Sequence, residues 1–158
     1  MVASNARVSF ATIHDLSPLQ RVRIEVPRWS FVKRKADGRV DVISPLPCPY
    51  NYGCIEDIVA ADGDGLDALV LGPRLAAGVL VETVVRAVYG FRDAGVEDPK
   101  LVCSAAPLTA AERRGIERFF WAYAWFKRGI HRARGESGTT AALGWLASPW
   151  ARAASSSS

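Results

Sequence analysis

The sequence has no hydrophobic run near the roughly 20 residues that a helix needs to cross a bilayer. Its first residues also lack a basic region followed by an apolar segment of signal-peptide length. These two absences argue against a membrane protein and against a secreted one. We therefore expect a cytoplasmic protein that has no membrane partner.

Cysteine is scarce, and the three thiols, Cys48, Cys54 and Cys103, are odd in number and show no CxxC spacing. A disulfide framework or a zinc site would need paired cysteines, so we expect buried, reduced thiols. With 158 residues, 49% of them hydrophobic and 23% charged, the chain is long enough for one domain with a sizeable core. We predict a single domain over residues 1–150 and a disordered Ser-rich tail over residues 151–158.

The charges are distributed unevenly along the chain. The formal net charge is +4 and the pI is about 9.2, an excess too small to identify a ligand by itself. The carboxylates gather in residues 56–67 and 93–98, while Arg and Lys surround residues 21–39 and 113–134. This separation of the two signs favours a site that binds a metal ion together with an anion.

Alternating polar and apolar residues predict a mainly antiparallel sheet. Residues 21–26 alternate in this way, and residues 39–43 do so after a turn that predicts a hairpin with residues 31–35. Three prolines then prevent regular structure until about Asn51. Further strands are expected at residues 68–71, at residues 79–91 as one or two strands, and at residues 101–103. For residues 1–20 we expect a short strand or an arm.

The strongest helix signal follows the strands and makes the fold class α+β. Thr109 and Glu112 have the spacing of a capping box, and the helix is expected to run to about Lys127 or Arg128, with Gly129 as its stop. One face carries Ile116, Phe119, Phe120, Tyr123 and Lys127, and the opposite face carries Arg114, Arg118, Trp121 and Trp125. Residues 135–148 are expected to form a loop and a short helical turn.

The stretch ADGDGLDALVL, residues 61–71, places Asp62, Asp64 and Asp67 within six positions, just before a buried strand. A solvated turn is one explanation, because Asp and Gly are common where a chain reverses. A site for a hard cation is the other, because the charge of an ion offsets the repulsion between carboxylates. An EF-hand is excluded, since its loop needs a longer run of ligands that a glutamate closes.

Four blocks in the same order resemble the soluble family I inorganic pyrophosphatases. They are NYGCIED with the acidic stretch that follows it, RIEVP at residues 23–27, DAGVEDPK at residues 93–100, and FFWAY at residues 119–123. The likeness extends over about residues 20–130. It implies an OB-like β-barrel with a flanking C-terminal helix, hydrolysis of pyrophosphate with several Mg²⁺ ions per site, and a homo-oligomer, a hexamer by the habit of the family.

The resemblance also assigns roles to individual residues. Asp64 matches the residue that accepts a proton from the attacking water. The metal ligands would be Asp62, Asp67, Asp93, Asp98 and Glu25. The substrate ligands would be Lys33, Tyr52, Lys100, Tyr123 and Lys127, which offer ammonium and phenol donors to phosphate oxygens. Clustered divalent ions would clamp the phosphates and lower the pKa of a water molecule.

The predicted hairpin departs from the family pattern. The family usually has a glutamate two positions after the matched lysine, whereas this chain has Lys35. The hairpin is also shorter, and Val42 or Ile43 stands where the family has an arginine that binds phosphate. Arg34 and Arg39 are candidate substitutes.

Further departures lie elsewhere in the site. Cys48 replaces a tyrosine, with Tyr50 nearby, and Gly65 replaces the proline of the acidic loop. Ala124 replaces the lysine that follows the helix tyrosine. Lys127 lies one turn later and is expected to face the same cleft as position 124, so it is a candidate stand-in.

Three functions from different classes remain open. The first is a divergent Mg²⁺-dependent pyrophosphatase, and the second is a metal-dependent phosphohydrolase with another substrate. The third is a catalytically silent binding or scaffold protein that uses the Arg and Trp face of the helix as a contact surface. A nucleic-acid partner is not expected, because stacking platforms in OB-like folds usually lie on sheets or in grooves. A subunit contact suits this face better.

Structural explanations compete with the ligand roles as well. Lys33 could be a solvated strand lysine, and Glu25 an exposed strand carboxylate. The two tyrosines could be packing residues, and Lys100 could pair with Glu97 or Asp98.

Overall fold

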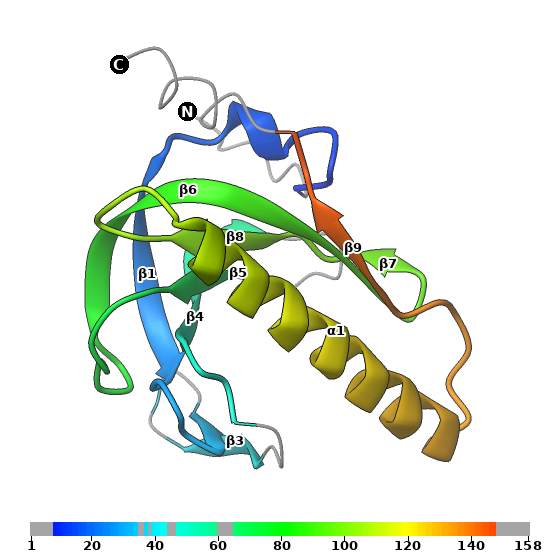
Figure 1. Ribbon diagram of the computed structural model, residues 1–158. Coiled ribbons are helices and arrows are strands. Elements are labelled where there is room, and N and C mark those ends of the chain that lie inside the picture. The colour runs from blue at the N-terminus through cyan, green and yellow to red at the C-terminus, as the bar shows by residue number, and fades with distance from the viewer. Residues whose placement is uncertain (1–7, 35–36, 38, 44–46, 60–64, 148–158) are drawn as a thin grey trace.

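The computed structural model describes residues 8–34, 37, 39–43, 47–59 and 65–147. Their elements follow the order η1 (Ile13–Asp15), β1 (Leu19–Val26), β2 (Val32–Arg34), β3 (Val40–Ile43), β4 (Asn51–Val59), β5 (Gly65–Val70), β6 (Leu80–Asp93), β7 (Val96–Glu97), β8 (Lys100–Cys103), α1 (Ala110–Ala133) and β9 (Ala141–Trp145). Figure 1 shows the curved sheet, with α1 packed along one side of it. No helix among these described residues is long and apolar enough to cross a membrane.

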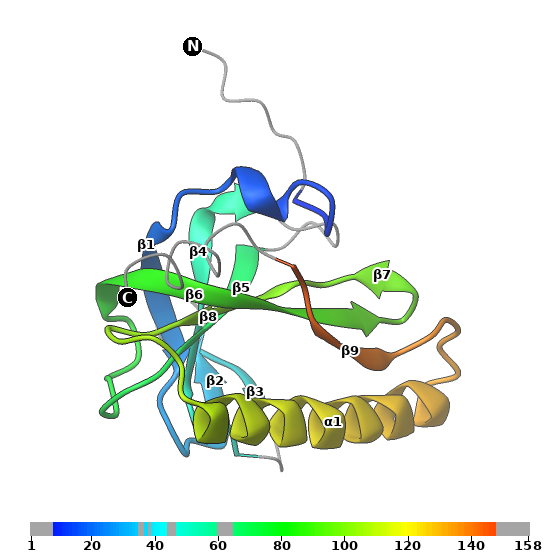
Figure 2. The same ribbon diagram turned by 45° about the horizontal axis from the view of Figure 1, so that its top comes forward.

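The main sheet closes on itself. Its strands pair in the order β1, β4, β5, β8 and β6, and β1 also pairs with β6, which completes the ring. The pairing of β5 with β8 is parallel, whereas the other pairings in the ring are antiparallel. β6 has 14 residues, enough to contact β1, β8, β7 and β9 along its length. These pairings confirm the predicted α+β class, the mainly antiparallel OB-like barrel and the flanking C-terminal helix (Figure 2).

Two hydrophobic cores follow from the alternation of side chains along the strands. On β5, Leu66, Ala68 and Val70 point into the barrel, where η1 also buries Ile13. Leu69 points to the other side, toward Phe120 and the rest of the second core under α1. Burial of a phenylalanine of this kind contributes about 3–5 kcal/mol to stability. The second core therefore fixes α1 against the barrel.

Glycine allows one close crossing of strands in the barrel. β1 and β4 approach each other so closely that a Cβ at Gly53 would lie 2.0 Å from the carbonyl oxygen of Arg23. A larger residue would therefore push the two strands apart. This close spacing gives a physical reason for the glycine of the NYG motif. The preceding residue, Tyr52, contributes its hydroxyl to the site described below.

The helix begins as predicted but ends later. Thr109 and Glu112 form both hydrogen bonds of the capping box. The predicted stop at Gly129 is wrong, because α1 continues to Ala133 and Gly135 takes the positive φ of 67° after it. A glycine inside a helix costs only about 1 kcal/mol relative to alanine, which the tertiary contacts of the next turn offset.

Several other strand and loop predictions are settled by the structure. The hairpin of β2 and β3 is confirmed, and the strand signal at residues 79–91 corresponds to one long strand, β6, which begins at Leu80. The predicted loop with a helical turn at residues 135–148 is wrong in part, because Ala141–Trp145 forms β9 and pairs with β6. Of the predicted strand or arm at residues 1–20, residues 1–7 lie outside the described residues, and the rest includes η1 and the first residues of β1. The tail at residues 151–158 lies outside the described residues.

The three cysteines, all of them in the described residues, form no disulfide with one another, as predicted. Cys48 and Cys103 are buried, and burial raises the pKa of each thiol to about 12. Cys54 is only partly buried, which corrects the expectation that all three thiols are in the core.

Candidate active site

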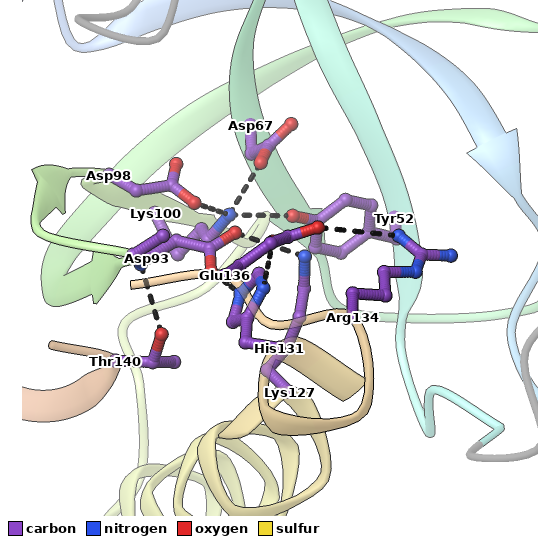
Figure 3. Close-up of polar contacts among 11 residues, drawn as sticks. Tyr52, Asp67, Asp93, Asp98, Lys100, Lys127, His131, Arg134, Glu136 and Thr140 are labelled. Atoms are coloured by element: carbon purple, nitrogen blue, oxygen red, sulfur yellow. Dashed lines mark hydrogen bonds and ion pairs between the residues drawn. The ribbon is translucent and has the colours of Figure 1, made fainter. Parts of the chain in front are cut away.

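Lys100 is the centre of a buried polar cluster on the side of the barrel that faces α1. Its ammonium donates to the hydroxyl of Tyr52 at 3.0 Å, to Oδ2 of Asp67 at 2.5 Å and to Oδ2 of Asp98 at 2.7 Å (Figure 3). The Lys100 side chain is only 2% exposed. An ammonium has three N–H groups, so all three are used. We refer to these four residues as the Lys100 cluster.

The strand register explains why these four side chains meet. β5 and β8 run parallel with Ala68 beside Leu101, so Asp67 lies level with Lys100. Tyr52 comes from β4, on the other side of β5. Asp98 lies in the turn before β8, where its backbone N–H donates to the carbonyl of Phe91. The cluster is therefore positioned by backbone pairing.

Burial and charge determine the protonation states of the Lys100 cluster. Burial alone would lower the pKa of Lys100, but Asp67, Tyr52 and Asp98 outweigh it and raise that pKa well above its ordinary value. Burial alone would raise the pKa of Asp67, but Lys100 outweighs it and holds that pKa low. Burial, reinforced by Asp67, raises the pKa of Tyr52 well above its ordinary value. At neutral pH, Lys100 and Asp67 are charged and Tyr52 keeps its proton.

A second polar cluster joins the end of β6 to the last turns of α1. Asp93 accepts from Nζ of Lys127 at 3.0 Å through Oδ2, and its Oδ1 contacts Nε2 of His131 at 2.6 Å (Figure 3). The other ring nitrogen of His131 contacts Oε2 of Glu136. We refer to Asp93, Lys127, His131 and Glu136 as the Asp93 cluster. Two segments 34 to 38 residues apart in sequence thus meet at one carboxylate.

Within the Asp93 cluster, the pKa values of Asp93, Lys127 and His131 are shifted toward their charged forms. Burial alone would raise the pKa of Asp93, but the hydrogen bonds of His131 and Lys127 outweigh it and lower that pKa. The hydrogen bond to Asp93 raises the pKa of His131. Burial alone would lower the pKa of Lys127, but the nearby Tyr123 and Asp93 raise it.

The loop after α1 closes against the turn that holds Asp93. The backbone N–H of Ala94 donates to Oγ1 of Thr140 at 2.9 Å, and that of Gly95 donates to the carbonyl of Thr139 at 2.7 Å. A Cβ at Gly138 would lie 2.4 Å from the carbonyl oxygen of Ala94, so only glycine allows this approach. The position of Asp93 is therefore fixed by backbone contacts on both sides.

The remaining predicted site residues lie around these two clusters. Glu25 of β1 pairs with Lys33 of β2 at 3.1 Å, and the charge of Lys33 also helps to lower the pKa of Asp67. The ring centroid of Tyr123 lies 5.8 Å from Nζ of Lys127, and Tyr123 also helps to raise the pKa of Tyr52. The described site residues therefore form one neighbourhood. Asp62 and Asp64 lie outside the described residues.

Three expectations about replacement of phosphate ligands meet different outcomes. Lys127 reaches the cluster, as expected from its place one turn after Tyr123. The idea that position 124 faces the same cleft is wrong, because Ala124 is 1% exposed and packs in the second core. Arg39 is no clear substitute for the family arginine, since its guanidinium is 84% exposed and pairs with Asp37 at 2.7 Å. The side chain of Arg34 lies outside the described part of the structure.

His131 and Glu136 are the members of the Asp93 cluster that the sequence analysis missed. His131 follows Lys127 by four residues, which places both side chains on one side of a helix. That signal was present in the sequence, but the expected helix stop at Gly129 concealed it. Glu136 lies in the loop after the helix, and no periodicity indicates its contact.

The donor chemistry of the site suits a hard divalent cation. Asp67 and Asp98 share the ammonium of Lys100, and carboxylate oxygens are the ligands that Mg²⁺ prefers. Oε2 of Glu25 is buried with no well-aligned hydrogen-bond donor, although Lys33 lies nearby. Within the described ranges, no three His, Cys, Asp or Glu side chains already surround one point. A bound cation would therefore need a further ligand from outside those ranges or a shift of the present side chains.

A closed barrel with a flanking helix, and with carboxylates and lysines between them, defines an OB-like barrel protein with a charged site beneath its C-terminal helix. The chain belongs to the inorganic pyrophosphatase family, whose model matches residues 22–119. Its sequence is 44% identical over 90 residues to the inorganic pyrophosphatase of Haemophilus influenzae, which covers 52% of this chain and 51% of that one. It is 38% identical over 100 residues to the inorganic pyrophosphatase of Gluconobacter oxydans, with 56% of each chain covered.

A solved structure supports the fold over a longer stretch. The crystal structure of an inorganic pyrophosphatase from Neisseria gonorrhoeae superposes with a TM-score of 0.66 at 28% identity, and covers 88% of this chain and 86% of that one. By sequence, the chain spans about half the length of the curated relatives it matches.

Proposed function

We propose that this chain hydrolyses inorganic pyrophosphate to two phosphates with the help of several Mg²⁺ ions. The observation that carries the proposal is the meeting of Asp67, Asp98 and Asp93 with Lys100 and Lys127 in one neighbourhood (Figure 3). The three aspartates and Lys100 belong to the blocks that resemble the family. Lys127 lies on α1, four residues after the last of these blocks. The relatives named inorganic pyrophosphatase support the same reaction.

The substrate is a compact polyanion, so the chain must supply hydrogen-bond donors for its oxygens. Lys33, Tyr123 and Lys127 would donate hydrogen bonds directly to these oxygens. A hydrogen bond to a charged partner contributes about 1.5–3 kcal/mol. Lys100 has a different first role in this geometry. Its three N–H groups hold Tyr52, Asp67 and Asp98, and contact with phosphate would require one of these bonds to exchange.

The attacking group would be a water molecule, and Asp64 would accept its proton. Mg²⁺ ions held by Asp62, Asp67, Asp93, Asp98 and Glu25 would offset phosphate charge and make that water more acidic. Lys100 keeps Asp67 ionised and close to Asp98, which prepares both carboxylates for that role. The burial of this cluster limits access of bulk water and so strengthens each electrostatic contact.

Phosphate release tests the proposal directly. We expect release from pyrophosphate that needs added Mg²⁺ and increases above neutral pH. Equal release in EDTA would contradict metal dependence. No release under any of these conditions would favour a binding or scaffold protein instead.

A second candidate is a phosphohydrolase that acts on another phosphoanhydride or on a phosphate ester. It is favoured by the burial of Ala124 and by the pairing of Arg39 with Asp37, because two expected phosphate cations are then missing. Rates with pyrophosphate, triphosphate and a phosphate monoester, measured side by side, separate the two candidates.

We also propose a homo-oligomer, with the outer face of α1 as one subunit contact. Trp121 and Trp125 are 66% and 68% exposed in the single chain. Neighbouring exposed aromatic side chains are typical of surfaces that another subunit covers. Replacement of both by glutamate should therefore reduce the mass measured by light scattering. Trp29, 55% exposed elsewhere on the surface, provides a matched control. An unchanged mass in the α1 variant would exclude a contact at this face.

A further inference from the structure

Three side chains that can donate hydrogen bonds stand in a row on α1. Tyr123, Lys127 and His131 follow one another at intervals of four residues, so they lie on one side of the helix. Tyr123 and Lys127 already belong to the proposed phosphate site. His131 extends the same row by one turn toward the end of the helix, where it meets Asp93 (Figure 3).

Asp93 uses both of its oxygens for this row. Oδ2 contacts Lys127 at 3.0 Å and Oδ1 contacts His131 at 2.6 Å, and the His131 side chain is only 15% exposed. A divalent cation bound to Asp93 would need at least one of these oxygens. It would also repel the positive charge of Lys127 a few ångströms away. Cation binding at Asp93 and the contacts seen here therefore compete.

Other contacts already hold the end of α1 in place. The N–H groups of Arg134 and Gly135 donate back to the carbonyls of Ile130 and Arg132. The loop that follows is tied to the turn after Asp93 by the hydrogen bonds of Thr139 and Thr140. The contact between His131 and Asp93 is thus not needed to end the helix or to place the loop.

Among the described residues, several expected phosphate cations are missing or already paired. Position 124 is in the core, Arg39 is paired with Asp37, and Lys100 uses its three N–H groups on the barrel. Lys127 and His131, in contrast, both contact Asp93. A cation that binds to Asp93 would compete for its oxygens and release these two side chains.

We propose that His131 is a phosphate-binding residue: Asp93 holds its Nε2 in the ligand-free protein, and Nε2 donates to a phosphate oxygen once Asp93 coordinates a divalent cation. Glu136 retains the other ring nitrogen and so keeps the imidazole oriented. The inference rests on the proposed function in one respect, namely that Asp93 is a cation ligand.

Nuclear magnetic resonance of the imidazole rings tests this inference at constant pH. The chain has only two histidines, and His14 in η1, on the far side of the sheet from α1, serves as the internal control (Figure 2). Addition of MgCl₂ should shift the His131 ring signals. Subsequent addition of methylenediphosphonate, a pyrophosphate analogue that cannot be hydrolysed, should shift them again. The His14 signals should stay in place during both additions.

Calorimetry supplies the matching affinities. His131→Gln should weaken methylenediphosphonate binding in the presence of Mg²⁺ by about tenfold or more, as expected for one lost charged hydrogen bond. It should not weaken Mg²⁺ binding itself, because Asp93 loses a competitor. His14→Gln should change neither affinity.

The outcomes separate this inference from the proposed function. If Mg²⁺ and the analogue bind but leave the His131 signals and the His131→Gln affinity unchanged, the inference is wrong, whatever the pyrophosphatase activity. A lower melting temperature of His131→Gln with unchanged affinity would likewise assign the residue a purely structural role. If pyrophosphate is not hydrolysed but His131→Gln still weakens the analogue, the phosphate site stands and the proposed reaction fails. Failure of both ligands to bind overturns both proposals.

Discussion

The Lys100 cluster and the Asp93 cluster each pair a lysine with carboxylates, but they differ in burial and in what positions them. Lys100 is 2% exposed, and its partners come from the neighbouring strands β4 and β5 and from the turn before β8. Lys127 is 28% exposed, and the Asp93 carboxylate is contacted by Lys127 and His131 of α1. A buried ammonium must keep its partners, whereas a partly exposed one can exchange them for water or a ligand. We infer that the first cluster is fixed and that the second can rearrange.

The largest effect on stability should come from a lysine introduced at a buried position where no carboxylate can pair with it. Ala124→Lys would place an ammonium in the second core, beside residues such as Phe120, and we expect a loss of at least about 3 kcal/mol in the free energy of unfolding. Urea denaturation measures this loss. Ala133→Lys, at an exposed position on the same helix, should change stability by less than about 0.5 kcal/mol. Equal stability of both variants would show that position 124 is open to the cleft after all.

Lys100→Met should have the next largest effect, because it removes the counter-charge of Asp98, which is buried, and of Asp67, whose side chain is 21% exposed. Removal of one partner of a buried ion pair costs about 3–5 kcal/mol. Lys127→Met is the matched control in the other cluster, and we expect a loss below about 1 kcal/mol, since Lys127 and Asp93 are both partly exposed. Similar losses in the two variants would remove the distinction between a fixed and an adjustable cluster.

Lys127→Ala should affect catalysis more than stability. Loss of one charged contact to a phosphate oxygen is expected to lower kcat/KM for pyrophosphate by about tenfold. Steady-state phosphate release, together with the urea midpoint of the same variant, separates the two effects. If hydrolysis is unchanged, Lys127 serves only as an ion-pair partner of Asp93.

The sequence predicts the fixed cluster better than the adjustable one. Tyr52, Asp67, Asp98 and Lys100 lie in or beside strands with strong apolar patterns, so motif and register together place them. The contact between Lys100 and Asp98 was anticipated as a structural alternative to phosphate binding, and the structure contains it. It does not exclude the other role.

The Asp93 cluster depends on contacts that no local pattern shows. α1 passes Gly129, and the turn that follows brings His131 to a residue 38 positions earlier in the chain. Glu136 reaches His131 from a loop whose path depends on β9. Likewise, the amino-acid type at position 124 does not reveal whether it faces the core, because alanine is compatible with either side.

The smallest predicted effect is a pH dependence of the Asp93 cluster. The pKa of His131 is raised, so its contribution to stability is full below the ordinary histidine value of about 6.5 and is lost as the pH rises through the folded value. The pKa of Asp93 is lowered, so its contribution is present above about 3.9 and is lost as the pH falls through its folded value. Together these shifts place the maximum between about pH 4 and 6.5.

The difference in unfolding free energy between the wild-type protein and His131→Gln should therefore be about 1 kcal/mol near pH 5.5 and should shrink by pH 8. Asp93 and Glu136 contact the imidazole, and Lys127 shares Asp93 with it, so Glu136→Gln is the appropriate control. Removal of that carboxylate charge should lower the pH at which the contribution of His131 disappears. A difference that stays constant from pH 5 to pH 8 would mean that the neutral imidazole already makes the full contact with Asp93. Nε2 would then be held as firmly as the amine of Lys100, and the two clusters would not differ in the way their burial suggests.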